Sequence, residues 1–170
     1  MNKKIIAVVE KYWIIFVVSA GFISACLALS LSAGQSVWFD EGYSILIAQE
    51  PVGELLSLTA VDAHPPFYYL LLKLWGEIFG FSELALRSLS AVAAGAAVAM
   101  ALTLIRRLFG TRVALMAAPI LILAPFALRY GYEIRMYAVA ALISIAATYA
   151  LVRAYEETGK KTWWVFYAVL

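Results

Sequence analysis

Long uncharged stretches alternate with short charged segments along this chain of 170 residues. A helix needs roughly 20 apolar residues to cross the ~30 Å hydrocarbon core of a bilayer. By this criterion we predict membrane spans over residues 12–33, 84–105, 113–129 and 135–153, and the beginning of a fifth over 162–170. A helix that stops inside hydrocarbon leaves its last carbonyl groups without donors. We therefore expect the sequence to be the N-terminal part of a longer membrane protein.

The segment 66–80 is also apolar, but its pattern predicts a helix that lies on the membrane surface. It is shorter than a span, and it carries Lys73 and Glu77. Each charge costs roughly 2.5–3.5 kcal/mol at the bilayer centre. Its aromatic residues belong to the types that favour the headgroup zone. We therefore expect residues 34–82 to form one extracytoplasmic loop that contains this interfacial helix.

The basic residues orient this arrangement. If 66–80 lies on the surface, nine of the 13 Lys and Arg residues share the side of the N-terminus, and four share the other side with eight of the 11 acids. The positive-inside rule then places the N-terminus in the cytoplasm of a multi-pass inner or plasma membrane protein. The first span exceeds the apolar region of a signal peptide, and cleavage near Gly34 is the less favoured alternative.

The composition agrees with this threading. Hydrophobic residues make up 65% of the chain and charged residues 14%, against roughly 45–50% and about 25% in soluble domains. A single cysteine, Cys26, excludes a disulfide framework. The net charge of +2 gives no reason to expect nucleic acid as a partner. The predicted fold class is an all-α integral membrane protein, a polytopic helical bundle.

The threading gathers ionisable residues at the extracytoplasmic face. Such groups are expensive at membrane depth, so a cluster of them predicts a functional site. A solvated helix end and an i,i+4 ion pair between Arg129 and Glu133 are the simpler alternatives. The aromatic residues nearby, among them Trp38 and Tyr68, are either an interfacial belt or a sugar-stacking surface. The ionisable residues concerned are Asp40, Glu41, Asp62, His64, Glu83, Arg87, Arg129, Glu133 and Arg135.

Acids and arginines at one membrane face have a chemical use. Moving a sugar from a phosphate to a hydroxyl needs a carboxylate that takes the hydroxyl proton. It also needs a cation, either a metal ion or a guanidinium group, that stabilises the departing phosphate. Adjacent carboxylates such as Asp40 and Glu41 are suitable ligands for a divalent ion. The same residues would also serve a transporter of an anionic solute, so both functions stay open at this point.

Five strings of this sequence resemble, in their order and spacing, the GT-C superfamily of polytopic glycosyltransferases. The similarity is to the branch that contains protein O-mannosyltransferases and the lipid A aminoarabinose transferase, and it covers nearly the whole chain. The strings are WFDEGYSILIAQE at 38–50, HPPFYYLLLKLWGEIFG at 64–80, SELALRSLSAV at 82–92, RRLFGTR at 106–112 and RYGYEIRMYA at 129–138.

The resemblance implies a role for each candidate residue. Asp40 would be the catalytic base or an acid next to a divalent metal ion, with Glu41 as its catalytic neighbour. Arg135 would contact the donor phosphate, together with Arg129 and His64. Ala63 and His64 stand where the aminoarabinose branch has an acidic residue and a lysine, which argues against that substrate. The supporting residues would be Asp62, Glu133, Tyr137 and Arg87.

The resemblance also implies the partners. The donor would be a sugar on a polyprenyl phosphate, and transfer to the acceptor would invert the anomeric centre. Membrane lipid and the remaining helices of the parent protein would complete the assembly, so we expect this segment alone to be inactive. The alternative is a non-enzymatic membrane module, either a transporter fragment or a protein that assembles other helices.

Overall fold

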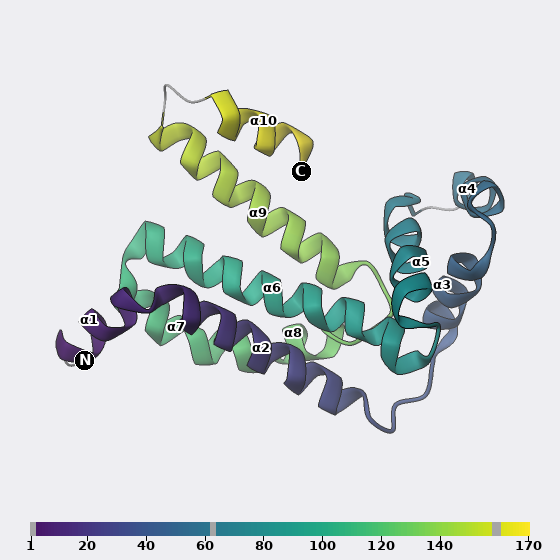
Figure 1. Ribbon diagram of the computed structural model, residues 1–170, viewed down its shortest axis with the longest axis horizontal. Coiled ribbons are helices and arrows are strands. Elements are labelled where there is room, and N and C mark those ends of the chain that lie inside the picture. The colour runs from purple at the N-terminus through teal and green to yellow at the C-terminus, as the bar shows by residue number, and fades with distance from the viewer. Residues whose placement is uncertain (1–2, 62–63, 158–160) are drawn as a thin grey trace.

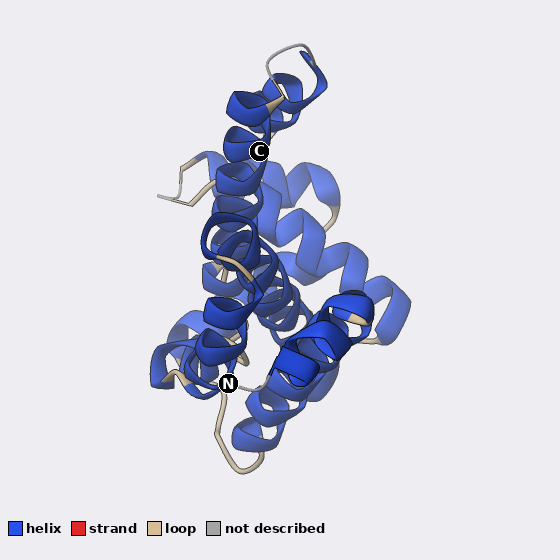
Figure 2. Cartoon of the chain, turned by 90° about the vertical axis from the view of Figure 1, so that its left-hand side faces the viewer, coloured by secondary structure: helices blue, strands red, loops and turns tan. Residues whose placement is uncertain are grey.

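A computed structural model describes residues 3–61, 64–157 and 161–170. In these residues the chain forms helices and loops and no strand (Figure 2). The helices are α1 (Lys3–Lys11), α2 (Trp13–Ser32), α3 (Phe39–Gln49), α4 (Val52–Ala60), α5 (Phe67–Phe79), α6 (Glu83–Phe109), α7 (Thr111–Leu123), α8 (Pro125–Tyr130), α9 (Tyr137–Glu156) and α10 (Lys161–Val169). The predicted all-helical fold is confirmed over these residues.

Among the described residues, three helices are long and apolar enough to cross a membrane, namely α2, α6 and α9. They correspond to the predicted spans 12–33, 84–105 and 135–153. The predicted span 113–129 is not a single helix in the structure, because the chain leaves helical geometry at Ala124 and divides into α7 and α8. Pro125 lacks an amide hydrogen and disfavours helical geometry at the residue before it. A fourth crossing made by α7 and α8 together stays a prediction.

Two glycines let α2 and α6 approach closely. A Cβ atom built on Gly21 would lie 2.5 Å from the carbonyl oxygen of Gly95, and one on Gly95 would lie 2.5 Å from the carbonyl oxygen of Gly21. Small residues permit this kind of backbone contact between membrane helices. The two helices run side by side for most of their length (Figure 1), which fixes where the N-terminus of α6 meets the C-terminus of α2.

The predicted loop 34–82 contains three short helices, which gather at one end of the bundle (Figure 1, right). The helix expected over 66–80 is α5, and its Lys73 and Glu77 form an ion pair of 3.1 Å. The indole nitrogen of Trp75 donates hydrogen bonds to the carbonyl oxygen of Ala85, at 3.0 Å, and to Oγ of Ser88, at 3.1 Å. These bonds fasten α5 to the first turns of α6.

The opposite end of the bundle brings together the helix ends that were predicted to face the cytoplasm. Arg107 of α6 pairs with Glu156 of α9. The hydroxyl of Thr111 donates to Glu10 at 2.9 Å, and the guanidinium group of Arg106 lies 4.5 Å from the ring centre of Trp13. The last helix, α10, packs back against α9. The ends of α2, α6 and α9 therefore form two groups at opposite ends of the bundle (Figure 1), and which group faces the cytoplasm stays a prediction.

Candidate functional site

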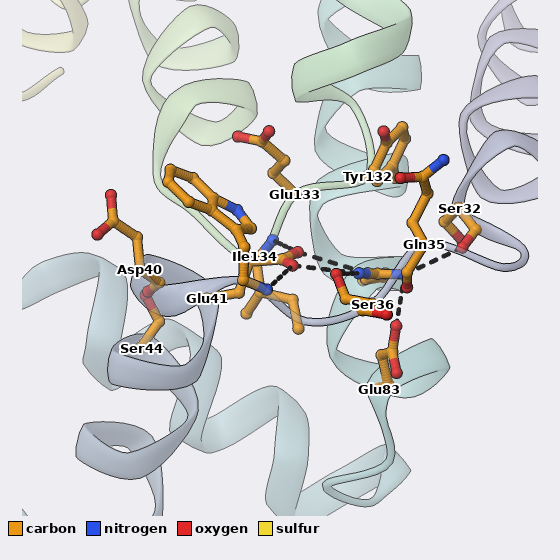
Figure 3. Close-up of polar contacts among 12 residues, drawn as sticks. Ser32, Gln35, Ser36, Asp40, Glu41, Ser44, Glu83, Tyr132, Glu133 and Ile134 are labelled. Atoms are coloured by element: carbon orange, nitrogen blue, oxygen red, sulfur yellow. Dashed lines mark hydrogen bonds and ion pairs between the residues drawn. The ribbon is translucent and has the colours of Figure 1, made fainter.

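A buried ion pair lies where α3, α6 and the connection from α8 to α9 meet. Nη2 of Arg87 lies 3.1 Å from Oε2 of Glu41, and the two side chains are 2% and 1% exposed. Oε1 of Glu41 also accepts the backbone N–H of Ile134 at 2.9 Å, and Oε2 accepts that of Trp38 at 3.4 Å. Figure 3 shows these bonds converging on the Glu41 carboxylate. The buried carboxylate is thus hydrogen-bonded through both oxygens, as a buried charge requires.

The same arginine organises the connection between α2 and α3. Nη1 of Arg87 donates to the carbonyl oxygens of Ser32 and Gln35, both at 3.0 Å, and it also contacts Glu83 on the preceding turn of α6. We call Glu41, Arg87 and these partners the Glu41–Arg87 network (Figure 3). It joins segments from three separate parts of the sequence, so it holds the start of α3 against the connection 131–136.

Asp40, the neighbour of Glu41, lies outside this network. Its carboxylate points away from the Glu41–Arg87 bonds (Figure 3) and its side chain is 37% exposed. Oδ2 of Asp40 is 3.8 Å from Nη2 of Arg135, a side chain that is 6% exposed. The same Nη2 lies 3.5 Å from Nε2 of His64. The structure therefore brings together three residues that sequence analysis placed in the site, from α3, from the segment before α5 and from the turn before α9.

Nε of Arg135, a buried atom near this group, has no hydrogen-bond partner among the described residues. A buried donor without an acceptor costs free energy, so this atom is available to a bound anion or its water. Burial raises the pKa of the Tyr68 phenol, and a contact with the side chain of Ser90 opposes part of this rise. The Tyr68 hydroxyl therefore stays a hydrogen-bond donor.

An apolar cavity of about 290 Å³ lies beside the same residues, between α5 and α9. His64 lies at its wall together with Pro65, Phe67, Tyr68 and Tyr69, and α9 contributes Val139, Ala140 and Ile143. The apolar lining of this cavity suits a hydrocarbon chain. The imidazole of His64 lies at the cavity wall, and the guanidinium group of Arg135 lies next to that imidazole.

Arg129 and Glu133 form an ion pair in which Nε of Arg129 lies 3.0 Å from Oε1 of Glu133. The i,i+4 pair considered from the sequence therefore exists, although α8 ends at Tyr130 and Glu133 lies in the connection that follows. Nη1 of Arg129 also donates to the hydroxyl of Tyr132 at 2.8 Å. The ring of Tyr137 packs edge-on against Tyr130, with centroids 4.8 Å apart.

The remaining expectation concerns a metal ion. No group of three or more His, Cys, Asp or Glu side chains in residues 3–61, 64–157 and 161–170 is arranged to hold one. Glu41 is engaged by Arg87, which leaves Asp40 as a single carboxylate ligand. Asp62 lies outside the described residues. These side chains do not by themselves make up a metal site, and we derive no chemical step through a metal.

Sequence reasoning missed two buried contributors. Tyr68 was grouped with the interfacial aromatic residues, yet it is only 5% exposed and faces the site. The hydroxyl of Ser90 on α6 donates to the carbonyl oxygen of Glu133 and so anchors the connection before α9. A serine within an alanine-rich stretch at 88–99 was the available signal, because a polar group inside a membrane helix needs a partner.

The fold and this site define a helical membrane protein with a buried polar centre at one end of its bundle. Residues 63–170 match the family described as dolichyl-phosphate-mannose-protein mannosyltransferase, and the chain belongs to that family. The expected membership of the GT-C glycosyltransferases is thereby confirmed. The match begins after Asp40 and Glu41, so the roles of those two residues rest on geometry. Curated proteins and solved structures provide no match to the chain.

Proposed function

We propose that this chain is the N-terminal catalytic segment of a membrane glycosyltransferase that moves a sugar from a polyprenyl phosphate to an acceptor hydroxyl. The observation that carries the proposal is the meeting of Asp40, Arg135 and His64 beside an apolar cavity. A carboxylate, a buried cation and a hydrocarbon-lined space are the three requirements of such a donor and reaction. Membership of a family of mannosyltransferases agrees with this chemistry.

Asp40 is the proposed base. The acceptor oxygen attacks the anomeric carbon while its proton moves to the Asp40 carboxylate. The bond between that carbon and the phosphate oxygen breaks, and its electron pair leaves with the polyprenyl phosphate. One direct displacement of this kind inverts the anomeric centre. Asp40 suits the role because it is half-exposed and its ion pair is long, at 3.8 Å, so its carboxylate is free to accept a proton.

Arg135 and His64 are the proposed contacts of the donor phosphate. The guanidinium group of Arg135 is 6% exposed and its Nε has no acceptor among the described residues. A phosphate would satisfy this donor, and a cation in a water-poor site stabilises the charge that develops on the leaving group. The apolar cavity between α5 and α9 would take the first part of the prenyl chain.

Glu41 and Arg87 receive a positioning role in place of the catalytic role expected for Glu41. Both are buried, and Glu41 already accepts bonds from Arg87, Ile134 and Trp38. By holding the first turn of α3 against the connection 131–136, the pair sets the distance between Asp40 and Arg135. The site faces the extracytoplasmic side in the proposed orientation, with the N-terminus in the cytoplasm and α7 and α8 completing a fourth crossing.

The experiment compares Asp40→Asn with Glu54→Gln in the full protein that carries this sequence, reconstituted with a polyprenyl-phosphate mannose. Glu54 is an exposed acid of the same loop and serves as the matched control. We expect Asp40→Asn to lower transfer by about 10²- to 10⁴-fold, the usual contribution of a positioned base, with the thermal unfolding midpoint unchanged. Transfer within tenfold of the wild type in Asp40→Asn would contradict the role of Asp40.

A further inference from the structure

A second pocket, of about 110 Å³, adjoins the Glu41–Arg87 network, and Glu41 and Arg87 line it. The connection between α2 and α3 contributes Gln35, Ser36 and Trp38 to its walls. The segment around the end of α8 contributes Arg129, Tyr132 and Glu133. Neither Asp40 nor Arg135 lines it, so this pocket is separate from the proposed phosphate contacts.

Glu133 has a hydrogen-bonding capacity that the protein leaves unused. Its side chain is 4% exposed, and Oε1 pairs with Arg129 at 3.0 Å. Oε2 is buried and accepts no hydrogen bond within the described residues. Figure 3 shows the carboxylate rising from the connection, away from the Glu41–Arg87 bonds. A buried carboxylate oxygen without a donor costs free energy, so a ligand that brings a donor to it gains affinity.

The charges around the pocket select the kind of ligand. Arg87 is compensated by Glu41, and Arg129 is compensated by Glu133, so the charged side chains that line the pocket sum to zero. A phosphate would find no uncompensated cation there. The exposed ring of Trp38, at 43%, offers an apolar face, and the side chains of Gln35 and Ser36 offer donors and acceptors. Polar groups beside an aromatic face suit a neutral molecule that carries several hydroxyls.

We propose that this pocket binds a neutral, hydroxyl-bearing group, and that Oε2 of Glu133 accepts a hydrogen bond from one of its hydroxyls. The proposal rests on the proposed function, because two molecules of that reaction carry such a group: the acceptor and the sugar ring of the donor. It assigns Arg129 and Glu133 to this ligand and takes Arg129 away from the donor phosphate, where sequence analysis placed it.

The first experiment measures KM and kcat for donor and acceptor in Glu133→Gln and Trp38→Ala, with Glu54→Gln as the control. Glu133→Gln keeps the size of the side chain and loses the carboxylate acceptor. Trp38→Ala removes the exposed aromatic wall. We expect KM for one substrate to rise about tenfold, as the loss of one hydrogen bond to a charged group implies, with kcat within about twofold. The substrate whose KM rises identifies which hydroxyls occupy the pocket.

A second measurement does not depend on transfer. Saturation-transfer NMR on the detergent-solubilised protein tests binding of methyl α-mannoside and of a peptide that contains serine and threonine. We expect the signal of one probe in the wild type and in Glu54→Gln, and its loss in Glu133→Gln and Trp38→Ala. If Glu133→Gln fails to fold, Trp38→Ala decides, because its side chain lies at the exposed rim.

The outcomes separate the two proposals. A wild type that binds a probe through this pocket but transfers no sugar supports the pocket and contradicts the proposed function. A wild type that transfers sugar while both pocket variants keep KM values within twofold of it overturns the pocket and leaves the proposed function standing. An equal rise of KM in Glu54→Gln also overturns the pocket, because that residue lies outside it.

Discussion

Two neighbouring acids, Asp40 and Glu41, form ion pairs of opposite character with two arginines. Glu41 and Arg87 are both buried, and Nη2 of Arg87 lies 3.1 Å from Oε2 of Glu41. Glu41 also accepts two backbone hydrogen bonds. Asp40 and Arg135 are 3.8 Å apart, Asp40 is 37% exposed, and Nε of Arg135 has no acceptor in the described part of the chain. The two acids are adjacent in the sequence, but in the fold one side chain is buried and the other is half-exposed.

The difference suits the two roles proposed for this motif, one structural and one chemical. A carboxylate with every oxygen occupied cannot take a proton without breaking a buried pair, which is strongly destabilising. A half-exposed carboxylate with one long contact can do so at small cost. This contrast supports the proposed roles of Glu41 in stability and of Asp40 in proton transfer. Substitutions made in one ion pair at a time test whether the two pairs differ in this way.

The largest stability effect is expected for Glu41→Ala. Removing this carboxylate leaves the Arg87 guanidinium group buried without its acidic partner on α3 and removes the acceptor of the Ile134 amide. We expect the free energy of unfolding to fall by about 3–5 kcal/mol, measured by denaturant titration in detergent. Glu54→Ala, an exposed acid of the same loop, is the control and should change it by less than about 0.5 kcal/mol. Equal effects in the two variants would mean that the buried pair does not hold the site.

A smaller effect is expected where α2 and α6 meet. Gly95→Ala forces a Cβ atom to within 2.5 Å of the carbonyl oxygen of Gly21, so the helices must separate and carry Ser32 away from Arg87. Overpacking of this kind costs about 1–3 kcal/mol. The thermal unfolding midpoint measures it, and Gly53→Ala is the control, since a Cβ atom there meets nothing within 4 Å. An unchanged midpoint in Gly95→Ala would show that the contact between these helices yields without cost.

The Asp40–Arg135 pair should contribute little to stability. A double-mutant cycle with Asp40→Asn and Arg135→Gln is expected to give a coupling of about 0–1 kcal/mol in unfolding, because Asp40 is half-exposed and the contact is long. The corresponding cycle with Glu41→Gln and Arg87→Gln should give a larger value. Comparable couplings for the two pairs would remove the distinction between them.

The smallest effect concerns the pH dependence of stability. Burial raises the pKa of Glu133 above its ordinary value of 4.5, and Arg129 opposes part of this shift. Because the fold favours the protonated carboxyl, this contribution to stability is complete below pH 4.5 and is lost as the pH rises through the folded-state pKa. We expect the unfolding midpoint of the wild type to fall relative to Glu133→Gln as the pH rises above 4.5. Parallel curves would show that Glu133 keeps its ordinary pKa.

Hydropathy alone predicted the three long helices and the short helix that became α5; the interfacial position of α5 stays a prediction. This works because the bilayer imposes length and composition on any segment that crosses it. The same reasoning does not show that the predicted span 113–129 divides at Ala124 into α7 and α8. Hydropathy averages over a window and does not register that Pro125 removes a single hydrogen-bond donor.

The sequence indicated which residues gather near the candidate site, but it did not indicate how they pair. Asp40, His64 and Arg135 do meet, because helices that cross the membrane return distant segments to the same face. Their neighbours Glu41, Arg129 and Glu133 face other partners. Adjacent residues in a turn or at a helix start point in different directions, and a motif read as a string does not show which.

The sequence by itself determined that this protein is a helical membrane protein, that it belongs among the GT-C glycosyltransferases, and which ionisable residues gather at one end of it. These properties depend on composition, spacing and order along the chain. Only the tertiary structure decided which acid is buried and which is half-exposed, and that Arg129 and Glu133 line a pocket apart from Asp40 and Arg135. Those properties depend on burial and on hydrogen bonds between segments far apart in the sequence, which exist only once α2, α6 and α9 have packed.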